Sequence, residues 1–118
     1  MYFNINEIEA AELADWVTEK ESQFSIIDVR EINEINAGTI PDAVPMPLAS
    51  LPVRLTELDK DKTFVLICRS GARSAQACAF MQNNGFNKVH NLRGGMFAWA
   101  SAGQPVGSAQ SMQTAQSN

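Results

Sequence analysis

Short apolar runs that suit buried β-strands alternate with helical patterns along this chain. The run SIIDV (25–29) is rich in β-branched residues, and TFVLIC (63–68) is the most strand-like segment. Leu13, Trp16 and Val17 recur at helical spacing. This alternation predicts an α/β fold with a parallel sheet. The expected strands are 2–5, 25–29, 44–46, 63–68 and 88–92, and the expected helices are 10–17, 32–37, 51–58, 72–83 and 96–100.

Length, composition and charge fit one globular domain. The chain has 118 residues, of which 45% are hydrophobic and 19% are charged, so it can form one hydrophobic core. A net charge of −4 offers no basic surface to nucleic acid, and no window has the length and apolarity of a transmembrane helix. The N-terminal residues include acids where a secretory signal has a basic flank. We therefore expect a cytoplasmic protein without nucleic-acid or membrane partners.

The last eleven residues differ in composition from the rest. Segment 108–118 holds one Met and otherwise small or polar residues, and so little apolar surface does not offset the entropy cost of ordering. We expect a folded domain over 1–107, followed by a disordered tail over 108–118.

A cysteine stands where the most strand-like segment meets the next predicted helix. Unpaired N–H groups and the helix dipole favour negative charge at a helix N-terminus, and successive loop amides can form an anion nest. Two guanidinium groups add positive charge, so we expect the pKa of the Cys68 thiol to fall below about 8.5, which gives a thiolate nucleophile at neutral pH. The loop residues that follow Cys68 are Arg69, Ser70, Gly71, Ala72 and Arg73.

A purely structural role is the alternative for each cysteine. Most free cysteines are small buried hydrophobes, but that role does not explain the basic loop after Cys68. It does fit Cys78, which lies mid-helix among alanines, and we expect no disulfide. His90 is the only histidine; we expect it to be packed or at the surface, because a preformed thiolate needs no general base. Two cysteines and one histidine are too few for a four-ligand zinc site, and we expect no metal.

Several motifs, in order, resemble the rhodanese-like domain family. FVLICRSGARSAQACAFMQNNGFNKVHNLRGGMFAWASAGQPV (64–106) is similar to the C-terminal half of such domains, and IIDVREINEINAGTIPDAVPMPL (26–48) to their other signature. The resemblance implies a single domain with a sheet of about five parallel strands and helices on both faces. The family usually has His where Thr39 stands and Gly where Asp42 stands, so the geometry of that loop is left open.

The resemblance also implies a reaction, the transfer of a sulfane sulfur through a persulfide on Cys68. The donor would be thiosulfate or another small anionic sulfane compound, and the acceptor cyanide, a small thiol or a thioredoxin-like protein, without a cofactor. Related phosphatase-like domains have one residue more between Cys and Arg, so a phosphatase or arsenate reductase is disfavoured. A non-catalytic or sulfur-relay binding module is the second hypothesis.

Several charged residues are expected to assist the reaction of Cys68. We expect Arg69 to hold the anionic donor and Arg73 to face inward and brace the loop. We expect Asp28, with Arg30 and Glu31, to pair with Arg73 or with loop hydroxyls. The alternative for Asp28 and Arg30 is an ordinary ion pair at a strand end.

Four further side chains have less specific expectations. Arg93 precedes two glycines and either lines the rim of the pocket or lies in solvent. Trp16, Phe97 and Trp99 are expected in the core, because large aromatic side chains dominate core energetics.

Overall fold

Within residues 4–19 and 23–110, which the computed structural model describes, five parallel strands form one sheet. Their order across the sheet is β1-β5-β4-β2-β3, so β4 is the central strand. The strands β2, β4 and β5 agree with the predicted segments, and the expectation of a parallel α/β sheet is confirmed. The strands are β1 (Asn6–Ile8), β2 (Phe24–Asp28), β3 (Val44–Pro45), β4 (Thr63–Ile67) and β5 (Val89–Leu92).

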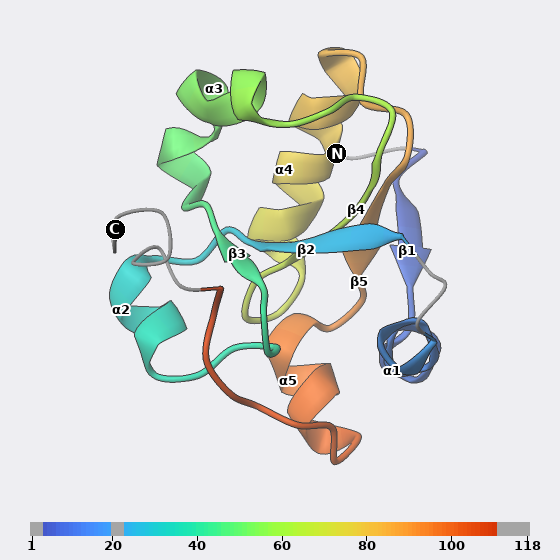
Figure 1. Cartoon of the computed structure of the whole chain (residues 1–118), viewed down its shortest axis with the longest axis vertical. Coiled ribbons are helices and arrows are strands. Elements are labelled where there is room, and N and C mark those ends of the chain that lie inside the picture. Colours follow the sequence, from blue (N-terminus) through green and yellow to red (C-terminus); the bar gives the residue numbers. More distant parts are fainter. Residues whose placement is uncertain (1–3, 20–22, 111–118) are drawn as a thin grey trace.

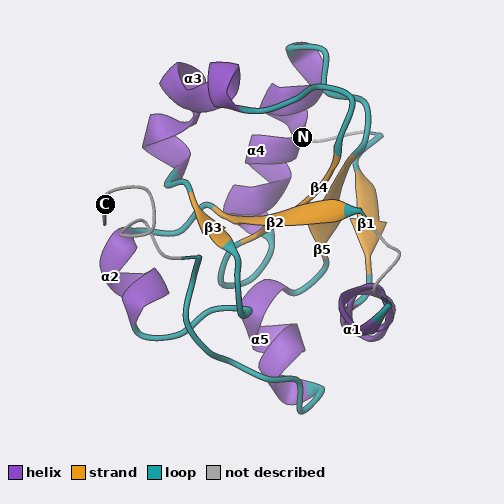
Figure 2. Ribbon diagram, in the orientation of Figure 1, coloured by secondary structure: helices purple, strands orange, loops and turns teal. Residues whose placement is uncertain are grey.

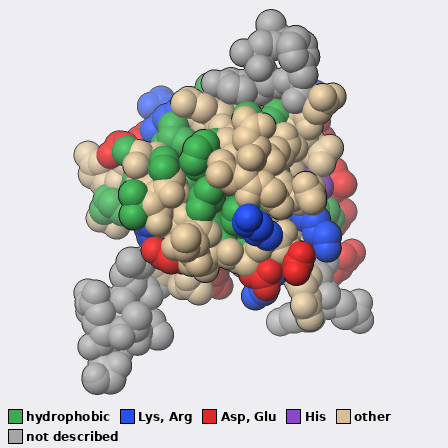
Figure 3. Space-filling model, turned by 90° about the horizontal axis from the view of Figure 1, so that it is seen from above, with side chains coloured by type: hydrophobic (Ala, Val, Ile, Leu, Met, Phe, Trp, Pro, Cys, Tyr) green, Lys and Arg blue, Asp and Glu red, His purple; other side chains and the backbone are tan. Residues whose placement is uncertain are grey.

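Helices cover both faces of the sheet, as expected. Figures 1 and 2 show α3 and α4 on one side of the sheet and α1 and α5 on the other. Figure 3 views the molecule from the end where α3 lies, and hydrophobic side chains gather on part of that surface. The helices are α1 (Ala10–Thr18), α2 (Ile32–Asn36), α3 (Leu51–Arg54), α4 (Ala72–Asn83) and α5 (Gly95–Ser101), with short 3-10 turns η1 (Leu48–Ser50) and η2 (Leu55–Glu57) on either side of α3.

The central strand contributes to two hydrophobic cores. Phe64 and Leu66 belong to the core that also contains residues of α3 and α4, whereas Val65 and Ile67 belong to the core that contains residues of α1 and α5. Side chains of a strand alternate between faces, and a parallel sheet covered on both sides is apolar along its whole length. This explains why the segment TFVLI has almost no polar residues.

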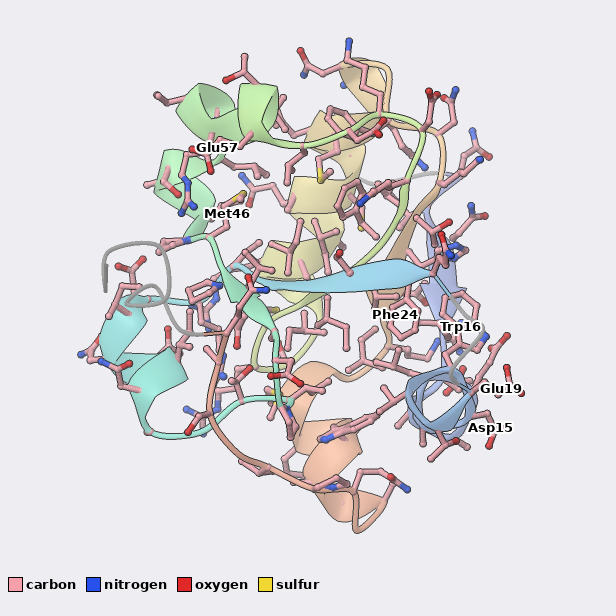
Figure 4. The ribbon with its side chains drawn as sticks, in the orientation of Figure 1. Asp15, Trp16, Glu19, Phe24, Met46 and Glu57 are labelled. Atoms are coloured by element: carbon pink, nitrogen blue, oxygen red, sulfur yellow. The ribbon has the colours of Figure 1, made fainter. Side chains whose placement is uncertain are left out.

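The aromatic residues divide between core and surface. Trp99 is 1% exposed and Trp16 is partly buried. Figure 4 shows Trp16 beside Phe24. The ring of Trp16 is edge-on to that of Phe24 at 5.4 Å and to that of His90 at 5.4 Å. His90 is therefore packed, and burial lowers its pKa, opposed only partly by Glu12. Phe97 is 74% exposed, so its predicted place in the core was wrong.

The helical geometry of α5 explains the exposure of Phe97. Met96 and Trp99, three residues apart, are 8% and 1% exposed and face the sheet. Residue 97 lies one position past Met96, about a quarter of a turn around the helix. One aromatic ring in this short helix is therefore buried while the other is in solvent.

The first strand lies later than predicted. The expected strand over 2–5 was wrong in the part that the structure describes, because Asn4 is a turn residue with φ 66° and the strand begins at Asn6; residues 2 and 3 lie outside the described residues. Among the described residues, edge strand β1 pairs with β5 alone, and both Asn6 and Glu7 are exposed. An edge strand tolerates such polar side chains, which gave β1 no apolar signal.

The folded region extends beyond the predicted boundary at residue 107. Asp42 N donates to the carbonyl of Ser108 at 3.0 Å, and Gln110 N donates to the carbonyl of Ala43 at 2.8 Å. The expectation of a disordered tail was therefore wrong for residues 108–110, because backbone hydrogen bonds need no apolar side chains. Residues 111–118 lie outside the part of the chain that the structure describes.

Candidate active site

The loop after β4 turns sharply into α4. Gly71 is the N-cap residue of α4 and has φ 102°, a conformation that glycine adopts without strain. A Cβ at this position would lie 3.3 Å from the backbone nitrogen of Gly94 and 3.4 Å from the carbonyl oxygen of Leu92. Both the turn and the close approach of another loop therefore require glycine here.

The sulfur of Cys68 lies against hydrogen-bond donors from this turn. Its Sγ accepts hydrogen bonds from Gly71 N at 3.1 Å and Ser74 N at 3.4 Å, and Ser74 Oγ lies 3.3 Å away. Burial raises the pKa of Cys68, but hydrogen bonds from Ser74, Gly71 and Ser70 outweigh it, so the pKa lies below its ordinary value. The predicted direction of this shift is confirmed.

The N-terminus of α5 holds the other side of the loop. Met96 N donates to Cys68 O at 2.8 Å, and Phe97 N donates to Arg69 O at 3.1 Å. Gly95 has φ 56°, and a Cβ there would lie 2.3 Å from Cys68 O. The loop is thus fixed between the helices α4 and α5 through its own backbone.

Arg73 braces the loop, but through a carboxylate that the sequence did not indicate. Its Nη1 lies 2.9 Å from Glu34 Oε1 and its Nη2 3.1 Å from Glu34 Oε2. The hydrogen bond from Arg73, followed by one from the backbone of Glu31, lowers the pKa of Glu34 to about 2. The expected pairing of Arg73 with Asp28 was wrong, because α2 places Glu34 within reach of the guanidinium group.

Asp28 instead forms a buried network with Arg30 and Thr39. Asp28 is 0% and Arg30 7% exposed; Arg30 Nη2 lies 2.7 Å from Asp28 Oδ2, and Thr39 Oγ donates to the same oxygen at 2.7 Å. Arg30 Nη2 also donates to Gly38 O at 2.8 Å. The alternative of an ion pair at a strand end is therefore the observed one, although the pair is buried. Since Asp28 is the register partner of Ile67, the network lies beside the end of β4.

The remaining predicted residues lie away from the sulfur or at the surface. Arg69 is exposed, as are Ser70 and Ala72, so these residues are available to a ligand at the loop. The side chain of Arg93 is 63% exposed and pairs with Glu7 and Glu9, which confirms the solvated alternative. Cys78 is 0% exposed in the core between α4 and the sheet, and both cysteines are free.

Two polar residues of the site, Ser74 and Asn91, were missed in the sequence. Ser74 is 0% and Asn91 1% exposed, and Asn91 Nδ2 donates to Gly71 O at 3.2 Å. Ser74 shares one helical face with Ala77, Cys78 and Met81, all buried. A hydroxyl at a core-facing position beside the cysteine loop was the signal that would have identified it.

The position of Asp42 accounts for one departure from the family pattern. Asp42 has φ 70°, the left-handed conformation in which glycine is most favourable and Asp is among the better tolerated alternatives. The backbone at this position is therefore in a conformation that suits both Asp42 and the glycine that the family resemblance implies.

Fold and site together define a class of protein, a parallel α/β domain with a low-pKa cysteine at the carboxyl end of its central strand. Ligands of such sheets bind at that end of the strands. The sequence model of the Rhodanese-like domain family matches residues 9–102. The chain belongs to this family.

Known proteins similar to this chain agree with that membership. A sulfurtransferase of Allochromatium vinosum is 43% identical over 102 residues, covering 86% of this chain and 94% of its own. The solved structure of a rhodanese-related protein from Thermoplasma volcanium has a TM-score of 0.78 at 30% identity and covers 86% of this chain and 97% of its own. A rhodanese-like domain protein from Staphylococcus aureus has a TM-score of 0.76 at 32% identity, with coverages of 80% and 91%. These relatives support sulfur transfer as the general activity.

Among the described residues, no helix is both long and apolar enough to cross a bilayer.

Proposed function

We propose that the chain transfers a sulfane sulfur from thiosulfate, or from another small anionic sulfane donor, through a persulfide on Cys68. The observation that supports this proposal is the set of donors around Sγ: Gly71 N, Ser74 N and Ser74 Oγ all lie within 3.4 Å of it. Donors that stabilise a thiolate make the sulfur a nucleophile at neutral pH. The same kind of environment stabilises negative charge as it develops during a reaction.

The reaction is a double displacement. The Cys68 thiolate attacks the outer sulfur of thiosulfate; an S–S bond forms to Sγ, and the bond to the sulfonate sulfur breaks, releasing sulfite with the bonding electron pair. Cyanide or a thiolate then attacks the outer sulfur of the persulfide. That sulfur leaves as thiocyanate or as a new persulfide, and the electron pair of the broken bond returns to Sγ as thiolate.

The two loop arginines have different roles in this proposal. Arg69 is exposed, so its guanidinium is free to meet an anionic donor at the loop. Arg73 forms an ion pair with Glu34, and this pair fixes the end of the loop. The loop from Cys68 to Arg73 has six residues, one fewer than in related phosphatase-like domains, which favours a single extra sulfur atom over a phosphate.

The acceptor and the location belong to the proposal as well. A small thiol or a thioredoxin-like protein is the acceptor class, since a second thiolate can attack the outer sulfur directly. Both cysteines are free thiols, as a cytoplasmic, reducing location would keep them.

The test is the intact mass of the protein after incubation with thiosulfate alone. We expect a gain of one sulfur atom with release of sulfite before any acceptor is added, and cyanide should reverse it with release of thiocyanate. Cys68→Ala should abolish the gain, whereas the matched variant Cys78→Ala should keep it. A wild-type protein that gains no sulfur from thiosulfate or other sulfane donors would refute sulfur transfer through Cys68 and favour the binding module. Hydrolysis of a phosphoester or reduction of arsenate would instead favour the phosphatase-like alternative.

A further inference from the structure

The hydroxyl of Ser74 has two potential acceptors but only one proton. Its Oγ lies 3.3 Å from Cys68 Sγ and also within hydrogen-bond distance of Asn91 Oδ1. A serine hydroxyl donates a single hydrogen bond. At any moment Ser74 Oγ therefore donates its hydrogen bond either to Cys68 Sγ or to Asn91 Oδ1, and the other atom receives no hydrogen bond from it.

The amide of Asn91 is held so that its oxygen faces Ser74. Asn91 Nδ2 donates to Glu7 Oε2 at 2.9 Å and to Gly71 O at 3.2 Å, and both partners are acceptors only. The nitrogen uses its two hydrogens there, which leaves Oδ1 for the hydroxyl. Because Ser74 and Asn91 are 0% and 1% exposed, water does not readily replace either partner.

We propose that Ser74 is a catalytic residue whose hydroxyl rotates as sulfur is transferred and donates its hydrogen bond alternately to Cys68 Sγ and Asn91 Oδ1, and that Asn91 is the positioning residue that accepts this hydrogen bond when Sγ does not. The proposal rests on the proposed sulfur transfer. When Sγ is a thiolate, Ser74 donates to it. When Sγ carries the outer sulfur, the negative charge lies one atom further out, and Ser74 donates to Asn91.

This exchange affects the two half-reactions unequally. During charging by thiosulfate, negative charge leaves Sγ, so a hydrogen bond to Sγ stabilises the reactant. During discharge to the acceptor, the electron pair of the broken S–S bond returns to Sγ, and the proton of Ser74 meets the charge as it develops. Only an interaction that strengthens toward the transition state accelerates a step. Ser74 should therefore accelerate discharge and give charging no acceleration, so that with Cys68 fully ionised, removing its hydroxyl leaves the charging rate equal or higher.

The surrounding charges do not differ between the variants that test this idea. Ser74 and Asn91 are uncharged, so replacing either with an uncharged residue leaves every ion pair around the sulfur unaltered. The charged and titratable groups that face the sulfur and its partners are Arg73 and Cys78 on α4, Asp28 on β2, Glu34 on α2 and Glu7 on β1.

The first experiment measures the rate of Cys68 alkylation by iodoacetamide against pH and needs no sulfur transfer. Below the pKa of Cys68, Ser74→Ala should react about tenfold more slowly, the effect of one hydrogen bond to a charged group. Asn91→Leu should react faster than wild type, because nothing then competes for the proton. Ser74→Thr, which keeps the hydroxyl and adds no charge, should not show the slowing of Ser74→Ala. Cys78→Ala, one turn along the same helix face, should match wild type.

The outcome that overturns the proposal is a change of the same sign in Ser74→Ala and Asn91→Leu, which would mean that both residues only support the loop. An unchanged Ser74→Ala would also overturn it. Thermal unfolding shows whether Asn91→Leu folds, and if it does not, the comparison of the two half-reactions below decides the question.

The second experiment separates the half-reactions at a pH where Cys68 is fully ionised in every variant. Rapid mixing with thiosulfate measures charging, and cyanide added to the isolated persulfide measures discharge. Ser74→Ala should discharge about tenfold more slowly, while its charging rate should not fall. Equal slowing of both steps would refute the exchange of the hydrogen bond but not sulfur transfer. A wild-type protein that acquires no sulfur would refute the proposed function, and the alkylation rates would still decide whether Ser74 and Asn91 compete.

Discussion

The guanidinium of Arg73 and the carboxylate of Glu34 form a two-point ion pair between α4 and α2, with Nη1–Oε1 at 2.9 Å and Nη2–Oε2 at 3.1 Å. The pair ties the last residue of the cysteine loop to a helix 39 residues earlier in the chain. The side chains are 37% and 32% exposed, so solvent screens their attraction. Its contribution to stability is therefore about 0.2–1 kcal/mol, and its larger effect is on the position of the loop.

Glu34→Gln should lower the free energy of unfolding by less than about 1 kcal/mol at neutral pH. Arg73 holds the pKa of Glu34 at about 2 instead of 4.5. A carboxylate with a lowered pKa stabilises the folded state above its unfolded pKa, and this contribution is lost as pH falls through the folded value. The difference between wild type and variant should thus shrink between pH 4.5 and about 2. Denaturant unfolding at a series of pH values measures it; a difference that stays constant over this window would contradict the assignment.

Gly95→Ala should disrupt the cysteine loop, whereas Gly103→Ala should not. Both glycines have positive φ, 56° and 74°, so both substitutions carry a strain of about 1–2 kcal/mol. A Cβ at Gly95 would also lie 2.3 Å from Cys68 O, but nothing lies within 4 Å of one at Gly103. We expect Gly95→Ala to lose the reactivity of Cys68 toward iodoacetamide and to unfold at a clearly lower temperature. Equal loss of stability with full thiol reactivity in both variants would show that the contact does not hold the loop.

Arg30→Met should be far more damaging than Arg93→Met. The partner of Arg30 is Asp28, which is 0% exposed, and removing one member of a buried pair costs about 3–5 kcal/mol. Arg93, 63% exposed beside Glu7 and Glu9, should contribute less than about 1 kcal/mol. Urea unfolding of both variants at neutral pH gives the comparison. A small effect at Arg30 would mean that water or a moved side chain satisfies Asp28 in the variant.

Most of the fold could be predicted from local patterns in the sequence. The helix over 72–83 and the buried strands around 25–29 and 63–68 agree with the structure because their signals, helical spacing and apolar runs, lie within each segment. The position of strand β1 was not predicted correctly, because an edge strand needs few apolar residues. The hydrogen bonds of residues 108–110 were not predicted either, because backbone groups form them and amino-acid composition does not indicate backbone hydrogen bonds.

The candidate site was predictable only in part, for a related reason. Cys68 and its loop are continuous in sequence, so their chemistry was evident. Glu34 and Asn91 reach the loop from α2 and β5, and their choice as partners depends on how the elements pack. Arg73 pairs with Glu34 and not with Asp28 because α2 brings Glu34 close to its guanidinium group. A single sequence does not contain the distances between elements, so it could not identify this partner.

The two free thiols should react at very different rates in the folded protein. Burial, with smaller effects from Glu7 and Cys68, raises the pKa of Cys78 to about 12, whereas the hydrogen bonds from Ser74 and the loop amides outweigh burial and lower that of Cys68. At neutral pH, iodoacetamide should therefore alkylate Cys68 at least about tenfold faster than Cys78. Peptide mapping after short exposure measures both rates.

Variants with a single cysteine show whether ionisation of the thiol or access of the reagent to it limits alkylation. Both thiols are 0% exposed and belong to the same core, but Cys68 lies directly beneath a loop whose residues Arg69, Ser70 and Ala72 are exposed, whereas Cys78 lies within α4. The variant Cys68→Ala, which keeps only Cys78, should be almost unreactive while folded and should react at the rate of an ordinary thiol in denaturant. The variant Cys78→Ala should react as wild type, with its rate falling only as pH drops below the lowered pKa of Cys68. Comparable rates for both thiols in the folded protein would remove the argument for a thiolate, since the hydrogen bonds around Sγ would then stabilise no charge.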